Sequence, residues 1–322
     1  MCEMIDFISI SQHICKYNPY LGNCKFQSSF SSGAQKYLLE GCEEMAVIHN
    51  PSTGLLEVKG SLPYFLNGHN FAFTWAEAVE AIEIIDSMLG NVGLWGAKVK
   101  AFENGVIVPV DLKPKEYIAK HYANPSTHLK QAYNEQYAGK FAMWKRKGEH
   151  IKLYDAGANI KMKQGLARRA VIEGAGWNPE GNYLKCEVRY TNPDWLNGNK
   201  PLTLEELQTE SFLDKLKENL MAQYHLLTPA KGLVLPSDKK DFKSLDILVF
   251  TLVEALMNGL GLSFEEAKKQ VYTTIRQAEC LTKSDKDARR RQIGKAFGKL
   301  EEAPASRWDL TNALQEALDA EI

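Results

Sequence analysis

Short segments in which apolar and polar residues alternate occupy most of the first two thirds of the chain. Alternation with a period of two is typical of strands that bury one face. Turn-forming residues separate three pairs of these segments, which indicates antiparallel hairpins with turns at 50–54, 103–105 and 147–148. The pattern predicts strands over residues 4–10, 45–49, 55–62, 95–102, 106–110, 141–145, 150–155 and 183–190.

Helical patterns are sparse at first and dominate after Leu204. Thr74 and Glu77 form a capping-box pattern that predicts a helix ending near Leu89, and Thr203 with Glu206 repeats the pattern. Short helices are expected at 34–39 and 114–122. Apolar periodicity predicts further helices over residues 212–224, 245–260, 264–278, 286–300 and 308–318.

Strands joined by hairpins, with few helices between them, indicate an α+β fold. We expect a mostly antiparallel sheet with packed helices, followed by an all-helical C-terminal module. Residues 228–243 hold two prolines and form the best boundary candidate. The expected organisation is a first domain over 1–227, a linker over 228–243 and a helical domain over 244–322.

Composition excludes several classes of protein. The 322 residues are 44% hydrophobic, and they contain no apolar run near the roughly 20 residues that a membrane span requires. The first residues are acidic, unlike a signal peptide. Six scattered cysteines without paired spacing favour neither a zinc site nor a secreted disulfide framework. We therefore expect a globular protein of a reducing cytoplasm, without a membrane partner.

Positive charge is local, because the net charge of the whole chain is −1. Residues 143–169 contain eight Lys or Arg against two acidic residues, and residues 283–299 contain seven against two. Clusters of this kind bind phosphate groups, although solvated surface segments have the same composition.

The sequence Lys-Gly-Ser-Leu-Pro-Tyr-Phe-Leu-Asn-Gly-His-Asn covers residues 59–70. It resembles a signature of the gene II and gene X replication initiators of filamentous phages and of their plasmid relatives. Those proteins nick one DNA strand to start rolling-circle replication. The resemblance extends over about 4–224, and it implies a replication-initiator or relaxase-like nickase fold with the active site on an antiparallel sheet.

Residues 151–161, Ile-Lys-Leu-Tyr-Asp-Ala-Gly-Ala-Asn-Ile-Lys, resemble the segment that carries the nucleophilic tyrosine in this family. The resemblance implies that Tyr154 attacks the DNA backbone and forms a covalent 5′-phosphotyrosine. Two positions differ, since Ala156 and Asn159 stand where the family has lysine and glutamate. Lys152 or Lys161 is the candidate replacement for the missing lysine, and the loss leaves open whether the chain is active.

The resemblance also implies a divalent metal ion, Mg²⁺ or Mn²⁺, which polarises the phosphate. Glu103, His69 and Glu187 are the candidate ligands, and Asp155 ranks below them. Glu103 is equally explained as a turn residue, and His69 as part of the turn architecture. The segment 184–190 resembles a family strand, and alternation places Lys185, Glu187 and Arg189 on one of its faces.

DNA is the expected partner, as a single-stranded or supercoiled origin, and a host helicase is a candidate partner of the helical module. The preferred interpretation is a phage- or plasmid-type rolling-circle initiator in the host cytoplasm, a metal-dependent nicking endonuclease and strand transferase. Alternatives are a non-catalytic origin-binding relative, a mobilisation relaxase and a globular protein unrelated to DNA. The candidate DNA-binding residues are Lys145, Arg146, Lys147, Lys161, Arg189, Arg289, Arg290 and Arg291.

Overall fold

The computed structural model describes most of the chain, and the chain divides into two compact units. Unit 1 comprises Met1–Ala119, Pro125–Leu226 and Thr311–Ile322, and unit 2 comprises Lys120–Asn124 and Leu227–Leu310. The residues that the structure describes are 5–14, 19–71, 73–123, 127–132, 140–158, 165–229, 246, 248–249, 251–253, 255–256, 262, 264–301 and 308–320.

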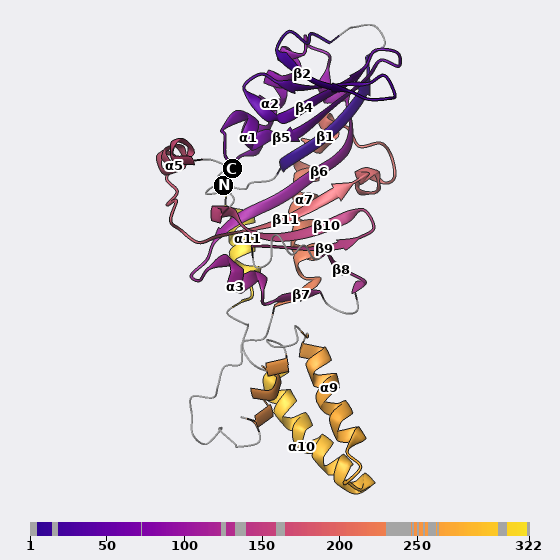
Figure 1. Ribbon diagram of the computed structural model, residues 1–322, viewed down its shortest axis with the longest axis vertical. Helices are drawn as coiled ribbons and strands as arrows, with labels where there is room; N and C mark the ends of the chain where they lie inside the picture. Colours follow the sequence, from indigo (N-terminus) through magenta and orange to yellow (C-terminus); the bar gives the residue numbers. More distant parts are fainter. Residues whose placement is uncertain are drawn as a thin grey trace. The chain divides into compact units, whose positions relative to one another are not determined.

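Unit 1 is built on a ten-stranded antiparallel sheet with the order β2-β3-β4-β5-β1-β6-β11-β10-β9-β8. Two sets of strands that are close in sequence meet where β1 pairs with β6 (Figure 1). The expected α+β class with a largely antiparallel sheet is confirmed. The strands are β1 (Ile5–His13), β2 (Cys24–Ser29), β3 (Gln35–Leu39), β4 (Cys42–Asn50), β5 (Leu55–Ser61), β6 (Lys98–Pro109), β8 (Lys130–Ala132), β9 (Phe141–Arg146), β10 (Glu149–Asp155) and β11 (Tyr183–Thr191).

Helices cover parts of this sheet. The helix α1 (Leu62–Leu66) contacts β1, β4 and β5, whereas α7 (Glu210–Tyr224) and α11 (Thr311–Asp319) contact β6 and each other (Figure 1). Asn104 of β6 donates a hydrogen bond to the carbonyl of Leu216, and Tyr190 of β11 donates one to Asn219, so α7 lies on the face of these strands to which Asn104 and Tyr190 point. Glu103 and Arg189 alternate with them and point to the other face. The remaining unit 1 helices are α2 (Trp75–Met88), η1 (Leu94–Gly96), α3 (Pro114–Ile118), α5 (Gly165–Gly174), η4 (Pro193–Asn197) and α6 (Leu204–Leu207).

Both expected capping boxes are present, at the start of α2 and of α6. Ala78, Ile82 and Ile85, on one side of α2, are buried in the core of unit 1. The expected hairpins β4–β5 and β9–β10 are also confirmed by their antiparallel pairing.

Two local predictions are wrong. Residues 34–39 were expected to form a short helix, but 35–39 form β3, which pairs with strands on both sides. The expected turn at Glu103-Asn104-Gly105 lies inside the continuous strand β6. A two-residue hairpin turn would require a positive φ, which Gly105 does not have. Its missing side chain instead allows the backbone of β11 to approach closely.

Gly105→Ala should therefore destabilise the protein by about 1–3 kcal/mol, the usual cost of overpacking. A Cβ at this position would lie 2.6 Å from the carbonyl oxygen of Cys186 and 2.9 Å from Cα of Glu187, both in backbone that β11 holds in place. Urea unfolding measures the change. Gly96→Ala is the matched control, because a Cβ there meets no atom within 4 Å. Equal stability of the two variants would contradict the explanation.

Unit 2 contains the pair β7 (His121–Ala123) and β12 (Leu227–Pro229) and the helices α9 (Phe264–Gln277) and α10 (Lys283–Glu301). Phe264, Ala267 and Val271 of α9 pack against Ala296 and Phe297 of α10. Of the helix expected over 245–260, residues 246, 248–249, 251–253 and 255–256 are described, and all of them are helical. The linker expected over 228–243 lies outside the described residues, apart from Thr228 and Pro229 in β12. Among the helices of the described ranges, none has the length and hydropathy of a membrane-spanning segment.

The division into units differs from the expected domains at the C-terminal end. Residues 244–322 were expected to form one helical domain, but α11 belongs to unit 1. Leu314 and Leu318, one helical turn apart, are buried on the face by which α11 contacts β6 and α7. The amphipathic pattern of this helix was recognisable, whereas the surface that it covers was not.

Candidate active site

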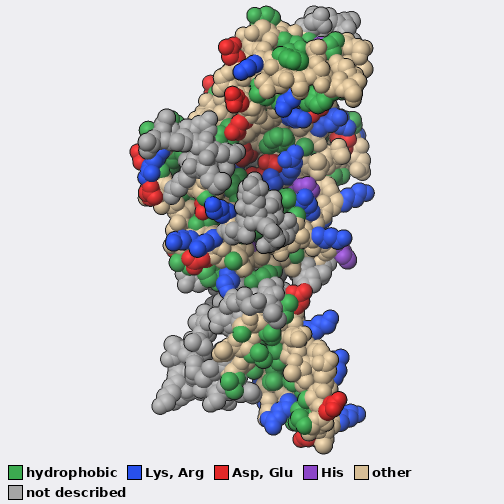
Figure 2. Space-filling view, viewed as in Figure 1, with side chains coloured by type: hydrophobic (Ala, Val, Ile, Leu, Met, Phe, Trp, Pro, Cys, Tyr) green, Lys and Arg blue, Asp and Glu red, His purple; other side chains and the backbone are tan. Residues whose placement is uncertain are grey.

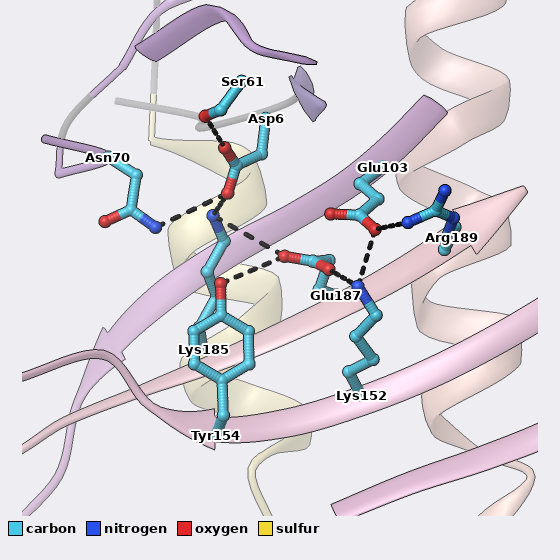
Figure 3. Close-up of polar contacts among 9 residues, drawn as sticks. All are labelled: Asp6, Ser61, Asn70, Glu103, Lys152, Tyr154, Lys185, Glu187 and Arg189. Carbon is cyan, nitrogen blue, oxygen red and sulfur yellow. Dashed lines mark hydrogen bonds and ion pairs between the residues drawn. The ribbon is translucent and has the colours of Figure 1, made fainter. Parts of the chain in front are cut away.

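A pocket of about 430 Å³ opens over β1, β6, β10 and β11 in unit 1, and Asp6, Glu103, Lys152, Tyr154 and Glu187 are among the residues that line it. The register of the sheet places these side chains together, since Lys152 lies opposite Glu187 and Tyr154 opposite Lys185. Residues directly opposite on neighbouring strands share a face and interact. Figure 3 shows the resulting cluster, in which these side chains converge from four strands.

Lys152 connects two carboxylates. Its Nζ lies 2.6 Å from Oε1 of Glu103 and 2.6 Å from Oε1 of Glu187, and Arg189 donates a further hydrogen bond to Glu103 at 3.0 Å. Burial and the nearby charge of Glu187 raise the pKa of Glu103 to about 7. The positive charge of Lys152 lowers this pKa and offsets part of the rise. Near neutral pH, Glu103 is therefore the carboxyl group of the cluster that can hold a proton.

Glu103→Gln should change how stability depends on pH. The unfolded chain releases the Glu103 proton near pH 4.5 and the folded chain near pH 7, so the folded state binds more protons between these values. As the pH rises from about 4.5 to about 7, the protonation of Glu103 should therefore lower the free energy of unfolding by about 3 kcal/mol. Glutamine at this position cannot bind or release a proton, so the stability of Glu103→Gln relative to the wild type should rise with pH.

Urea unfolding between pH 5 and pH 8 tests this expectation. Glu43→Gln removes an exposed carboxylate on β4 and controls for the substitution itself. If the stability difference between Glu103→Gln and the wild type is constant over the window, the raised pKa of Glu103 is refuted.

A second ion pair lies on the other side of Glu187. Nζ of Lys185 lies 2.5 Å from Oδ2 of Asp6, and Asp6 also accepts hydrogen bonds from Ser61 at 2.7 Å and Asn70 at 3.4 Å. Burial alone would raise the pKa of Asp6, but Lys185 and these hydrogen bonds outweigh it and lower the pKa. Ser61 and Asn70 belong to the 59–70 motif, so this motif orients an aspartate that the sequence analysis did not identify.

Tyr154 is the side chain with the chemistry of a nucleophile. Its hydroxyl donates a hydrogen bond to Oε2 of Glu187 at 3.1 Å (Figure 3). Burial, and then the negative charges of Glu187, Asp6 and Glu103, raise the pKa of Tyr154 well above its ordinary value. Burial would also raise the pKa of Glu187, but Lys152 and Lys185 outweigh it and hold the pKa below normal. The phenol is therefore neutral and its hydrogen-bond acceptor ionised at neutral pH.

The expected metal ligands are only partly brought together. Glu103 and Glu187 share Lys152, whereas His69 is buried elsewhere and its Nδ1 accepts a hydrogen bond from the backbone N–H of Phe71 at 3.2 Å. Burial lowers the pKa of His69. Within the described ranges, no three His, Cys, Asp or Glu side chains are arranged to hold a metal ion. Asp155, the lower-ranked candidate, accepts a hydrogen bond from the backbone N–H of Ala158.

The position at which the sequence departs from the family pattern has a structural explanation. Ala156 is buried against Phe71, Ile107, Ile172 and Tyr183, so a lysine there would have to enter an apolar cluster. Lys152, two residues before Tyr154, is one of the cations that the site does contain. Asn159 and Lys161 lie outside the described residues.

The other predicted DNA-binding residues occupy three places. Arg189 contacts Glu103 and places its guanidinium 4.6 Å from the ring centroid of Phe7. The basic residues 145–147 lie at the β9–β10 turn, and Arg290 and Arg291 of α10 line a surface groove in unit 2 with Tyr272. Arg289 of the same helix is exposed.

Asp6 and Lys185 complete the cluster and were not predicted as site residues. Lys185 was placed on the correct strand face, and its alternation with Glu187 was the available signal. Asp6 gave a weaker one, namely a carboxylate between Ile5 and Phe7 in a strand of mainly apolar residues. Charged side chains that are largely buried are usually paired, and Asp6, whose side chain is 12% exposed, pairs with Lys185.

By fold and site, the chain is an α+β protein with a tyrosine, three carboxylates and three cationic side chains clustered on an antiparallel sheet. No protein-family model matches the chain, and no curated protein is significantly similar to it in sequence. The resemblance to phage and plasmid initiators therefore rests on the residue motifs alone.

Proposed function

We propose that the protein is a rolling-circle replication initiator, a site-specific single-strand DNA endonuclease and strand transferase in which Tyr154 is the nucleophile. The observation that carries the proposal is the hydrogen bond from the Tyr154 hydroxyl to the ionised Glu187 carboxylate in an open pocket with cationic side chains. A nucleophile, a base within hydrogen-bonding distance and a group that orients the base are the parts of an activated nucleophile.

The proposed reaction exchanges one phosphodiester for another. Oη of Tyr154 attacks phosphorus, the bond from phosphorus to O3′ breaks, and the phenolic proton passes to the Glu187 carboxylate. The departing O3′ takes up a proton and becomes a free 3′-hydroxyl, while the 5′-phosphate stays bonded to Tyr154. Lys152 holds Glu187 at 2.6 Å and so keeps the base in place, and its positive charge attracts the phosphate.

Mg²⁺ or Mn²⁺ remains part of the proposal. Glu103 and Glu187 offer the oxygen ligands that these ions prefer, and they already hold a cationic group, the Lys152 ammonium, between them. Glu103 would hold the metal ion while Glu187 stays paired with Lys152 as the base, and the bound ion would polarise the phosphate. His69 is not proposed as a ligand.

A row of side chains offers a route for the DNA backbone to this site. Register pairs connect neighbouring strands in the order Lys130, Lys145, His150, Arg189 and Glu103, from the edge strand β8 to β6. Figure 2 shows Lys and Arg side chains gathered around acidic ones on this side of unit 1. Clustered cations supply the affinity for phosphate that the neutral whole chain lacks.

The test is a search for a covalent protein–DNA adduct. The protein is incubated with supercoiled DNA that carries its own replicon, with Mn²⁺ and separately with EDTA, and the products are separated on denaturing gels. Nicked DNA with protein on the 5′ end supports the proposal. Absence of both nicking and adduct under every condition refutes it.

A second candidate is the non-catalytic origin-binding relative. The observation that favours it is the raised pKa of Tyr154, because a phenol surrounded by carboxylates resists ionisation. Specific origin binding without any adduct would identify this alternative. A mobilisation relaxase would form the same adduct on a transfer origin instead. A host helicase as partner and a place in the host cytoplasm are proposed together with the initiator role.

A further inference from the structure

A second hollow in unit 1, of about 1170 Å³, lies at the turn between β9 and β10. Lys130, Lys145, Arg146 and Lys147 line it together with Trp195. Figure 2 shows Lys and Arg side chains projecting at the margin of unit 1 where β11 ends. The hollow shares none of its lining residues with the Tyr154 pocket.

Three of the four cations of this hollow have no ion pair within the described part of the chain. Of the four, Arg146 forms an ion pair, with Glu149, and the structure shows no ion pair of Lys130, Lys145 or Lys147 with another described residue. Unpaired cations that line one concave surface attract a polyanion.

Trp195 is 41% exposed, which is unusual for the largest apolar side chain. It belongs to η4, which follows β11, and its Nε1 lies above the turn glycine Gly148, 3.8 Å from the place of a Cβ there. A side chain larger than a methyl group in place of Gly148 would contact the indole. The site thus joins an accessible aromatic ring to a basic turn.

The backbone that carries Trp195 is fixed by its neighbours. Asp194 forms an ion pair with Lys98 at 2.6 Å and accepts a hydrogen bond from the backbone N–H of Leu202, while Lys215 donates one to the carbonyl of Leu196 at 3.2 Å. Pro193 and Leu196 are buried. Trp195 is the side chain of η4 that lines the hollow, and the contacts of its neighbours hold the η4 backbone in place before a ligand binds, which lowers the entropic cost of binding.

We propose that this hollow binds single-stranded DNA and that one base stacks on the indole of Trp195. An exposed aromatic ring beside a row of cations is the arrangement by which proteins hold single strands without reading their sequence. Bases in a duplex are already stacked on each other and cannot use the ring. The inference rests on the proposed function only for the choice of DNA as the nucleic acid, and it adds a base-binding site apart from the Tyr154 pocket.

The test measures binding of a fluorescein-labelled 12-nucleotide oligothymidylate by anisotropy. EDTA and the Tyr154→Phe background prevent cleavage. Trp195→Ala should weaken binding about 5- to 100-fold, the equivalent of one lost stack, and Trp195→Phe should restore most of the affinity. Phe26→Ala removes an aromatic ring of 54% exposure on β2 and should leave the affinity unchanged.

The salt dependence separates stacking from charge. Trp195→Ala should keep the wild-type slope of log affinity against log salt, whereas Lys147→Ala should reduce the slope by about 0.7. A duplex of the same length should bind Trp195→Ala and wild type equally.

Three results would overturn the inference: no oligonucleotide binding by the wild-type protein, equal affinities of Trp195→Ala and Phe26→Ala, or an equal loss on duplex DNA. Since no cleavage is measured, the inference stands or falls separately from the proposed reaction. Absence of a covalent adduct would refute the proposed nicking reaction of Tyr154 but would not affect the conclusion about base stacking on Trp195.

Discussion

Tyr154→Phe should eliminate the covalent adduct while DNA binding stays within about twofold of the wild type. Phenylalanine keeps the ring and removes only the attacking oxygen, so the bond to phosphorus cannot form at this position. Loss of a nucleophile in covalent catalysis typically reduces the rate on the order of 10⁴- to 10⁶-fold. Glu187 loses one hydrogen bond but keeps its ion pair with Lys152, so the variant should remain folded.

The measurement is adduct formation on denaturing gels beside oligonucleotide binding by anisotropy. Tyr37→Phe is the matched control, since its hydroxyl also donates to a side-chain oxygen, that of Gln35, but far from the site on β3. An adduct that persists in Tyr154→Phe would assign the nucleophile to another residue. Loss of binding in Tyr154→Phe would show that the tyrosine holds DNA as well.

Lys152→Met should destabilise the protein by about 3–5 kcal/mol at pH 8. The ammonium group stands between Glu103 and Glu187, whose side chains are 10% and 2% exposed, and its removal leaves two carboxylates facing each other without their shared cation. Removal of one partner from a buried ion pair costs this much because the remaining charge is uncompensated. At pH 6 the loss should be smaller, since Glu103 then holds a proton.

Urea unfolding followed by tryptophan fluorescence suits this measurement, because five of the six tryptophans belong to unit 1 and only Trp308 to unit 2. Lys98→Met is the matched control. Its ion pair with Asp194 has the same 2.6 Å separation but is 41% and 28% exposed, so its loss should cost at most about 1 kcal/mol. Glu103→Gln should recover part of the stability of Lys152→Met. Equal costs for the two lysine variants would refute the buried-charge explanation.

Much of the fold was predictable because it is local. The hairpins β4–β5 and β9–β10, and both capping boxes, rest on residues within one turn or one loop. The failures occurred where distant segments decide the structure. Gly105 looked like a turn residue, yet β1 and β11 on both sides of β6 extend the strand through it. The short segment 35–39 became a strand because β2 and β4 pair with it.

In the candidate site, too, the residues placed by local sequence patterns were predictable, and those placed by distant segments were not. Alternation placed Lys185, Glu187 and Arg189 on one face from the sequence alone, and the motif around Tyr154 led to the residue at the centre of the pocket. Asp6 could not be found in this way, because its contact with Lys185 joins residues 179 positions apart. His69 was chosen because of the resemblance of residues 59–70 to the family motif, but its burial depends on packing that no local pattern encodes.

The return of α11 to unit 1 has a consequence for dissecting the molecule. Apart from the short stretch Lys120–Asn124, unit 2 is inserted into unit 1, since the chain leaves the sheet-bearing unit after Leu226 and re-enters it at Thr311. A stop codon after Leu226 would remove α11, which contacts β6, and would expose apolar surface of the sheet. Excision of 227–310 with a flexible bridge to Thr311 would spare that helix. Removal of the C-terminal residues would thus remove part of the unit that it was meant to isolate.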